Sequence, residues 1–283
     1  MELLHPSSLD ALELDDGRVL LAGGTELVPL VRDGLVRAET LVDVLELLPR
    51  GIDGTEGGTR IGAGATLAEL EVDPQVPDAL REAARLAASP QLRAMGTVAG
   101  NLLQQTRCWY WRLGFECRLR GGDRCHAREG EHREHAILAN GFCASAHPSD
   151  VAAALLALGA TLRTDRRELP VGALYRVPTE DDRRTTALEP GEVVLELDVP
   201  AADASVYLKA GSRRRYSFPL VGVAAARRGG TTRVALAGVA PIPWLLEAGL
   251  EAATPLPGTA YKVELARALV RRALEALASG SAD

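Results

Sequence analysis

Four cysteines carry the clearest chemical signal in this 283-residue chain, and the chain has no others. Cys108, Cys117, Cys125 and Cys143 lie in one stretch, with the spacing C-x8-C-x7-C-x17-C. Thiolates are ligands for soft metals, and in a reducing compartment clustered cysteines bind metal more often than they form disulfides. The spacing therefore predicts a metal centre.

The thiols alone leave three interpretations open. Disulfides fit poorly with the expected cytoplasmic location. That expectation rests on the N-terminus, where we find no basic region followed by an apolar one, the pattern of a secretory signal. Zinc sites usually pair their ligands as short Cys-x2–4-Cys units, and the chain has none. An iron–sulfur cluster tolerates wider spacing, because a cubane is larger than a single ion. His126, His132 and His135, which lie among the cysteines, are interpreted as ordinary polar loop residues.

The segment that contains the cysteines has little periodicity and is rich in Arg, Gly and His. A loop of this length is uncommon unless it is functional or disordered, and its aromatic residues argue against disorder. A metal centre would order it, because ligand-binding free energy can serve as folding free energy.

Two glycine-containing turns predict a second site. A strand over 19–22 runs into Gly23-Gly24-Thr25-Glu26, and a helix is expected to follow. Glycines allow a ligand close to the backbone, and the free N–H groups that begin a helix attract phosphate. The stretch Thr97-Val98-Ala99-Gly100-Asn101 has the same character. A dinucleotide pyrophosphate needs donors from two sides, although two purely structural turns remain an equal alternative on this evidence.

Composition excludes other classes of protein. The formal charge of -6 argues against a nucleic-acid-binding surface. No run of about 18 apolar residues is present, so no membrane span is expected. The length suits two domains, and we place the boundary near residue 170, giving domains at 1–170 and 171–283.

Hydrophobic periodicity predicts a mixture of helices and strands. A capping box of Thr66 and Glu69 is expected to begin a helix over 67–70, and Ser149 or Asp150 to begin another that Gly159 ends. Further helices are predicted over 8–14, 77–88 and 261–277. Strands are predicted over 40–44, 60–66, 160–163, 193–199, 205–209, 220–226 and 232–239, the last two joined at Gly229-Gly230.

Three motifs together resemble the FAD-binding subunit of molybdenum hydroxylases, a family that includes xanthine and carbon monoxide dehydrogenases. They are Ala22-Gly23-Gly24-Thr25-Glu26-Leu27, Thr97 through Leu102, and His147-Pro148-Ser149-Asp150. The cysteine stretch is similar to an insertion, here about 103–146, found in 4-hydroxybenzoyl-CoA reductase and a bacterial aldehyde oxidoreductase. There it carries an extra 4Fe–4S cluster.

The resemblance implies an α+β fold: a two-subdomain α/β FAD-binding domain, then a smaller α+β domain with a three-stranded antiparallel sheet and helices. It implies that the four cysteines hold the cluster and that Asp150 bonds the FAD. The residues expected to contact the cofactor are Ala22, Gly23, Gly24, Thr25, Glu26, Leu27 and Val28, with Thr97, Ala99, Gly100 and Asn101 on the other side.

The chain departs from the family pattern at three places. Glu26 stands where Asp or Asn is commoner, Ala99 stands where Gly is usual, and the chain is shorter between Trp244 and Tyr261, where a helix is expected to be missing. The flavin-facing residue of the C-terminal domain is expected near Ser217 or Leu220.

The resemblance implies an electron-transfer subunit with FAD and a 4Fe–4S cluster. Its expected partners are a molybdopterin-binding large subunit, a 2Fe–2S small subunit and a small-molecule electron acceptor or donor. No residue needs to act as nucleophile or base, because the flavin carries the chemistry. The alternatives are a stand-alone flavin and iron–sulfur oxidoreductase of a biosynthetic pathway, and a zinc-stabilised binding protein without redox function.

Overall fold

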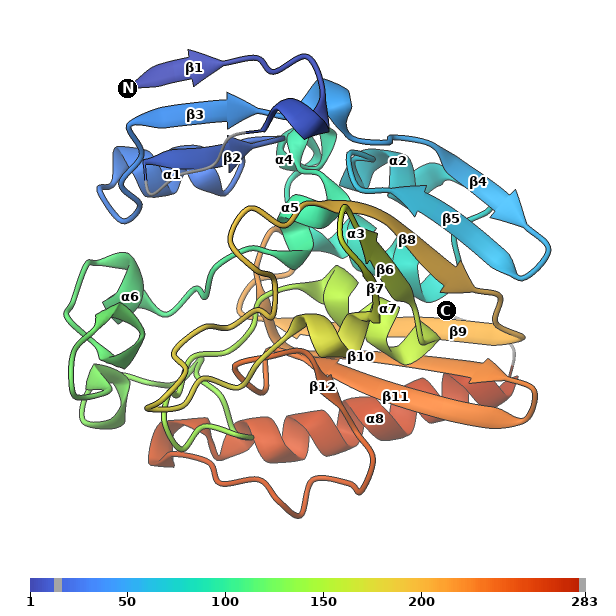
Figure 1. Ribbon diagram of the computed structural model, residues 1–283. Helices are drawn as coiled ribbons and strands as arrows, with labels where there is room; N and C mark the ends of the chain where they lie inside the picture. The colour runs from blue at the N-terminus through green and yellow to red at the C-terminus, as the bar shows by residue number, and fades with distance from the viewer. Residues whose placement is uncertain (13–16, 280–283) are drawn as a thin grey trace.

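The computed structural model describes residues 1–12 and 17–279, which form an α+β fold built on three sheets (Figure 1). The first sheet is parallel, with the order β1 (Glu2–Leu4), β3 (Thr40–Asp43), β2 (Arg18–Leu21). The short helix α1 (Leu27–Arg32) follows β2. This confirms the predicted strand, turn and helix around the first glycine turn.

The second sheet is antiparallel and has five strands. Its order is β4 (Ile52–Thr55), β5 (Gly58–Gly62), β8 (Val194–Pro200), β6 (Thr161–Thr164), β7 (Glu168–Pro170). β8 lies beyond residue 170 in the sequence, yet it pairs with both β5 and β6. The boundary near residue 170 stays a prediction, whereas a boundary after β8 would keep this sheet in one unit.

The third sheet forms the C-terminal part. Its order is β12 (Trp244–Leu245), β11 (Thr231–Ala237), β10 (Pro219–Arg228), β9 (Ala204–Gly211). The three long strands match the expected antiparallel sheet, and the two-residue β12 extends it. Helix α8 (Tyr261–Ser279) runs along one face, and α3 (Asp78–Ala87) and α7 (Asp150–Leu158) pack on the other (Figure 1).

The helices around the site begin as the sequence predicts. Thr66 and Glu69 form a complete capping box for α2 (Leu67–Val72). The Ser149 hydroxyl accepts the backbone N–H of Ala152 at 2.9 Å and caps α7. Gly159 ends α7 with a φ of +73°, which glycine adopts without steric cost. In the chain, helices α4 (Pro90–Met95) and α5 (Val98–Leu102) lie between α2 and α7.

Several segments have less regular structure. The predicted helix over 8–14 is a 3₁₀ turn, Leu9–Ala11, and positions 13–14 lie outside the described residues. The cysteine segment contains only α6 (Trp109–Arg112) and two 3₁₀ turns, Arg118–Arg120 and His126–Arg128. Its part around α6 stands at the left edge of Figure 1, while the backbone N–H groups of Ile137 and Leu138 bond the Val239 oxygen after β11. Between β12 and α8, the 3₁₀ turn Pro257–Thr259 is the sole helical element.

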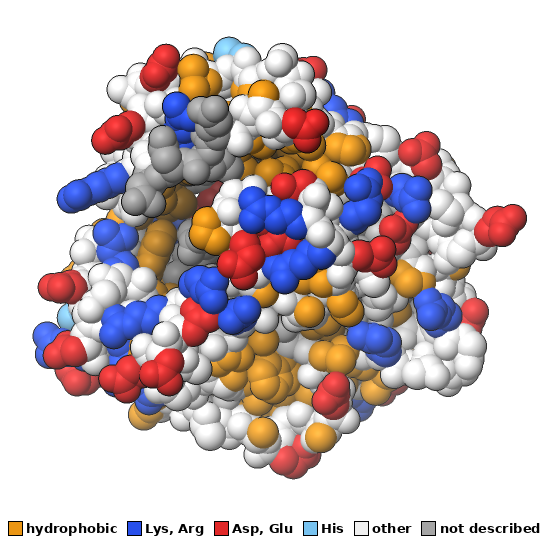
Figure 2. Space-filling model, viewed as in Figure 1, with side chains coloured by type: hydrophobic (Ala, Val, Ile, Leu, Met, Phe, Trp, Pro, Cys, Tyr) orange, Lys and Arg blue, Asp and Glu red, His pale blue; other side chains and the backbone are white. Residues whose placement is uncertain are grey.

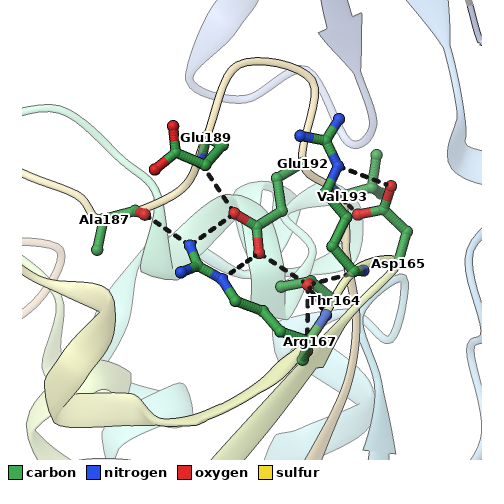
Figure 3. Close-up of polar contacts among 8 residues, drawn as sticks. Thr164, Asp165, Arg167, Ala187, Glu189, Glu192 and Val193 are labelled. Carbon is green, nitrogen blue, oxygen red and sulfur yellow. Dashed lines mark hydrogen bonds and ion pairs between the residues drawn. The ribbon is translucent and has the colours of Figure 1, made fainter.

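A buried carboxylate fixes the loop that leads into β8 (Figure 3). Glu192 accepts hydrogen bonds from Nε and Nη2 of Arg167, from the Thr164 hydroxyl and from the Glu189 backbone N–H, each at 2.8 Å. The pairing with Arg167 is the main cause that lowers the pKa of Glu192 to about 2. The side chain therefore stays charged and holds both ends of this loop together.

On the face seen in Figure 2, acidic and basic side chains are interspersed. Among the residues that the structure describes, no helix is long and apolar enough to cross a membrane.

Candidate functional site

The two glycine turns lie against each other. A Cβ added at Gly23 would be 1.9 Å from the backbone oxygen of Met95 and 3.3 Å from the nitrogen of Thr97. Gly24 adopts a φ of +69°, in the left-handed region that favours glycine. The missing Cβ of Gly23 thus lets the second turn approach the first. From the sequence, we expected it to let a ligand approach.

A pocket of about 210 Å³ opens where the two turns meet. Its wall contains half of the residues predicted to contact the cofactor: Thr25, Glu26, Thr97, Gly100, Asn101 and Asp150. The other six predicted residues are close in sequence to residues of the wall but do not line the pocket themselves: Ala22, Gly23, Gly24, Leu27, Val28 and Ala99. Ala99 is buried within α5.

The pocket wall also includes residues that the sequence reasoning missed. Arg107 belongs to the cysteine segment, and its guanidinium carbon lies 4.5 Å from the centre of the Phe218 ring. Tyr216 lines the pocket with a φ of +55°, a conformation that nothing in the sequence reveals. Ser217, which lies where a flavin-facing residue was expected, is in the wall, whereas Leu220 is not.

Asp150 is almost completely buried at the base of this pocket. One carboxylate oxygen accepts the hydroxyl of Tyr207, and the other accepts Nζ of Lys209 at 2.7 Å. Burial raises the pKa of Asp150, while the Lys209 ammonium and the Tyr207 hydroxyl act in the opposite direction. Each carboxylate oxygen has one protein partner and can accept a further hydrogen bond from a ligand. The bond between Asp150 and FAD stays a prediction.

Glu26 joins the pocket to the cysteine segment. Its Oε1 accepts Nη2 of Arg112 at 2.6 Å and the backbone N–H of Gln105 at 3.1 Å, while its Oε2 lies 2.6 Å from Nη2 of Arg107. Burial is the main cause that lowers the pKa of Arg107 to about 10, so the guanidinium remains charged at neutral pH. A carboxylate at this position therefore neutralises two arginines that flank Cys108.

The four cysteines surround one small pocket, as their clustering in the sequence suggested. Cys108, Cys117, Cys125 and Cys143 all line it, together with Ser145 and the aromatic ring of Tyr110. The open volume is about 10 Å³. This space is about that of one water molecule, so the four thiols lie close together around it.

Hydrogen-bonding nitrogens reach two of the thiols. The backbone N–H of Ser145 lies 3.5 Å from Sγ of Cys143, and Nε2 of His135 lies 3.2 Å from Sγ of Cys108. Burial raises the pKa of Cys108 to about 11 and that of Cys143 to about 12. When no metal is bound, both thiols are therefore protonated at neutral pH. Metal binding would have to displace their protons.

His135 is a buried contact of this centre and not the ordinary polar loop residue that the sequence suggested. Burial lowers its pKa to about 4, so the imidazole is neutral. The ring packs edge-on against Trp109, with centroids 4.9 Å apart. Its backbone oxygen accepts Nζ of the fully buried Lys262 at 2.8 Å, which ties this loop to α8. A histidine directly before the apolar run Ala136-Ile137-Leu138-Ala139 gave no signal of this role in the sequence.

In the described ranges, no group of three or more His, Cys, Asp or Glu side chains is arranged to hold a single metal ion. The donor set at the cysteine pocket consists of four sulfur atoms, with N–H donors around them, and thiolates are the usual ligands of iron–sulfur clusters. These residue types fit such a cluster.

Comparisons with known proteins show the family of this chain. Residues 4–202 match the family model described as the FAD binding domain in molybdopterin dehydrogenase. The FAD-binding subunit PaoB of an Escherichia coli aldehyde oxidoreductase is 36% identical over 247 residues, covering 82% of this chain and 78% of that protein. The FAD-subunit of Eubacterium barkeri nicotinate dehydrogenase is 34% identical over 87 residues, or 29% of each chain.

Two solved structures share the fold. Carbon monoxide dehydrogenase of Hydrogenophaga pseudoflava aligns with a TM-score of 0.72 at 24% identity, covering 99% of this chain and 98% of that chain. Quinoline 2-oxidoreductase of Pseudomonas putida 86 aligns with a TM-score of 0.71 at 20% identity, covering 99% and 96%. Given the family model and the PaoB identity, this chain belongs to the FAD-binding subunits of molybdenum hydroxylases, a family of flavoprotein oxidoreductase subunits.

Proposed function

We propose that this chain binds FAD between its two glycine turns and a 4Fe–4S cluster at its four cysteines. In that proposal it passes electrons between the 2Fe–2S clusters of a partner subunit and an external acceptor or donor. The observation that carries the proposal is the contact between the two sites. Arg107 lines the flavin pocket, precedes the thiol Cys108 in the chain, and pairs with Glu26 of the first turn.

The flavin part of the proposal assigns the binding residues of this chain. Thr25, Thr97 and Asn101 would supply polar contacts from the two turns, and Asp150 would accept a hydroxyl from the base of the pocket. Arg107 would add a positive charge at the wall, which favours phosphate or a negatively charged flavin ring. The pocket of about 210 Å³ holds only part of a dinucleotide, so the rest would extend along the adjoining surface.

The cluster part of the proposal rests on four thiols and their donors. Cys108, Cys117, Cys125 and Cys143 would bind as thiolates, and a bound cluster would supply one-electron transfer. His135 and the Ser145 N–H would donate hydrogen bonds to two of the sulfurs. Such donors stabilise the negative charge on thiolates and so help to set the reduction potential.

The partner part of the proposal is supported by two relatives, which are named as FAD-binding subunits of an aldehyde oxidoreductase and of a nicotinate dehydrogenase. We propose a molybdopterin-binding subunit, where substrate chemistry would occur, and a 2Fe–2S subunit, in a cytoplasmic complex. The molybdopterin-binding subunit would bind the substrate, because the proposed function needs no nucleophile or base from this chain.

The test is anaerobic purification of the tagged chain from its native cells, with metals and flavin quantified on the same fraction. The proposal expects molybdenum near one per flavin and more than four irons per flavin, since the partner brings its own clusters. Flavin with about four irons, no molybdenum and no second polypeptide would favour the stand-alone oxidoreductase. A fraction with zinc and neither flavin nor iron would contradict both.

A further inference from the structure

Lysine is rare in this chain and is used only for buried cations. Of the 32 Lys and Arg residues, Lys209 and Lys262 are the only lysines. The Lys209 side chain is 6% exposed, and Lys262 is completely buried. Lys209 pairs with Asp150 of the proposed flavin pocket, and Lys262 bonds the loop that carries His135. The two ammonium groups therefore lie where the two cofactors are proposed to bind.

The ammonium of Lys262 ties three backbone carbonyls together. Its Nζ donates to the backbone oxygens of Glu134 at 3.1 Å, His135 at 2.8 Å and Gly238 at 2.5 Å. An ammonium has three donors, so all of them are used, whereas the planar guanidinium of an arginine would not fit three acceptors around one point. The first turn of α8 thus holds the His135 loop against the residue that follows β11.

The charge of Lys262 is not neutralised by its surroundings. Lys209 forms an ion pair with Asp150 at 2.7 Å, but in the described ranges no carboxylate forms one with Lys262. Burial lowers the pKa of Lys262 to about 7, and the exposed Glu134 opposes this only in part. Carbonyl oxygens solvate an ammonium without neutralising it, and a buried charge is costly unless it is paired. A negative group close by would therefore stabilise the charged form.

The cysteine pocket provides such a negative group once its thiols are deprotonated. His135, whose backbone oxygen accepts Nζ of Lys262, places Nε2 of its ring 3.2 Å from Sγ of Cys108. Burial first, and the ammonium of Lys262 second, lower the pKa of His135. The positive charge of Lys262 therefore acts on the imidazole that contacts the thiol. A single residue, His135, links the buried cation to the first of the four cysteines.

We propose that Lys262 is a positioning residue of the cysteine site, which acts through the His135 loop as the counter-charge of the four thiolates and of the cluster that they bind. The inference rests on the proposed 4Fe–4S cluster but not on the binding of FAD. Reduction adds one electron to a centre that already carries the negative charge of its thiolates. A buried cation stabilises the reduced form more than the oxidised form, so it raises the reduction potential of the cluster.

The experiment uses the full chain, expressed alone and purified anaerobically, so that no cluster of a partner subunit contributes. The potential of the cluster is measured by EPR-monitored redox titration, and the potential of the flavin by its absorbance in the same sample. K262Q removes the charge and keeps a hydrogen-bond donor, K262M removes both, and K262R keeps a charge. The matched control is R272Q, which removes an exposed cation from the same helix.

The proposal expects K262Q and K262M to lower the reduction potential of the cluster by at least a tenfold change in the one-electron equilibrium, or about 59 mV. K262R should lower it by less than half as much, because the charge remains. R272Q should change the equilibrium less than twofold, because solvent and salt screen an exposed charge. The reduced cluster of K262Q should keep the g values of the wild type, and the potential of the flavin should be the same in all four variants.

Three results would overturn the proposal. An unchanged cluster potential in K262Q and K262M would mean that the charge does not reach the cysteine site. A potential in K262R as low as in K262Q would mean that charge is not the cause. Loss of iron from both neutral variants, with or without the flavin, or altered g values in K262Q, would make Lys262 a structural anchor of the loop. A wild-type protein without iron would instead contradict the proposed function, so the two failures are distinguishable.

Discussion

The carboxylate of Glu26 lies 2.6 Å from the guanidinium Nη2 of Arg112, and this contact joins the first glycine turn to the cysteine segment. The two residues are 86 positions apart in the chain. Arg107 pairs with the other oxygen of the same carboxylate. A single acidic side chain thus positions the wall of the proposed flavin pocket and the start of the cysteine segment relative to each other, and one substitution should disturb both.

Glu26→Gln is expected to weaken both cofactor sites at once. The change leaves two poorly exposed arginines without their counter-charge, which typically costs about 3–5 kcal/mol for a fully buried pair and less here, where both remain partly exposed. We expect loss of flavin on gel filtration together with lower iron content, and a lower urea midpoint. E129Q is the control, since Glu129 pairs with Arg124 only at 4.0 Å and is exposed. Loss of one cofactor with full retention of the other would contradict this coupling.

Gly23→Ala is expected to separate the two glycine turns. The added methyl group would be 1.9 Å from the Met95 backbone oxygen, so the backbone must move, at a cost of about 1–3 kcal/mol or more. Flavin affinity, measured by fluorescence titration of the apoprotein, should fall at least tenfold. Gly57→Ala provides the comparison, because nothing lies within 4 Å of a Cβ at that position. If G23A binds flavin as tightly as G57A does, the contact between the turns does not build the site.

Glu192→Gln tests the buried network in Figure 3. The charged hydrogen bonds to Arg167 predict a loss of about 1.5–3 kcal/mol in the free energy of unfolding at pH 7. The pKa of Glu192 is lowered to about 2 in the fold, so its contribution is complete above its ordinary pKa and is lost as the pH falls toward 2. Urea unfolding at pH 7, 5 and 3.5 should therefore show a gap between wild type and variant that narrows only below about pH 4.5. A gap independent of pH would point to packing as its cause.

His135→Phe removes the ring nitrogen that bonds Sγ of Cys108 and keeps an aromatic ring against Trp109. If the cluster is present, its reduction potential should fall, because the thiolate loses a hydrogen bond that stabilises negative charge. A tenfold change in the one-electron equilibrium corresponds to about 59 mV, and a shift of that order is expected in an EPR-monitored titration. His132→Phe, at a half-buried residue that bonds the Gly130 oxygen and the Gly258 backbone N–H but no cysteine, should leave the potential unchanged. An unchanged potential in H135F would deny the histidine this role.

The sequence predicted the regular elements well where local chemistry determines them. Thr66 with Glu69, Ser149 and Gly159 mark helix ends through bonds made within a few residues. The pairing of β8 with β5 was not foreseen, because partners more than 130 positions apart leave no local trace. The same reason explains why we missed Arg107, Tyr216 and His135. Their positions depend on burial and on contacts with distant segments, and their neighbours in the chain do not reveal these contacts.

The central claim is that one chain carries both FAD and a four-thiolate iron–sulfur cluster. The most direct test is the visible spectrum of anaerobically purified protein expressed alone, with iron, acid-labile sulfide and zinc assayed on the same sample. We predict flavin bands above a broad shoulder, with about four irons and four sulfides per flavin, and loss of the iron but not the flavin in C117S/C125S. Flavin without iron, or zinc in its place, would contradict the cluster, and a protein without flavin under these conditions would contradict the account as a whole.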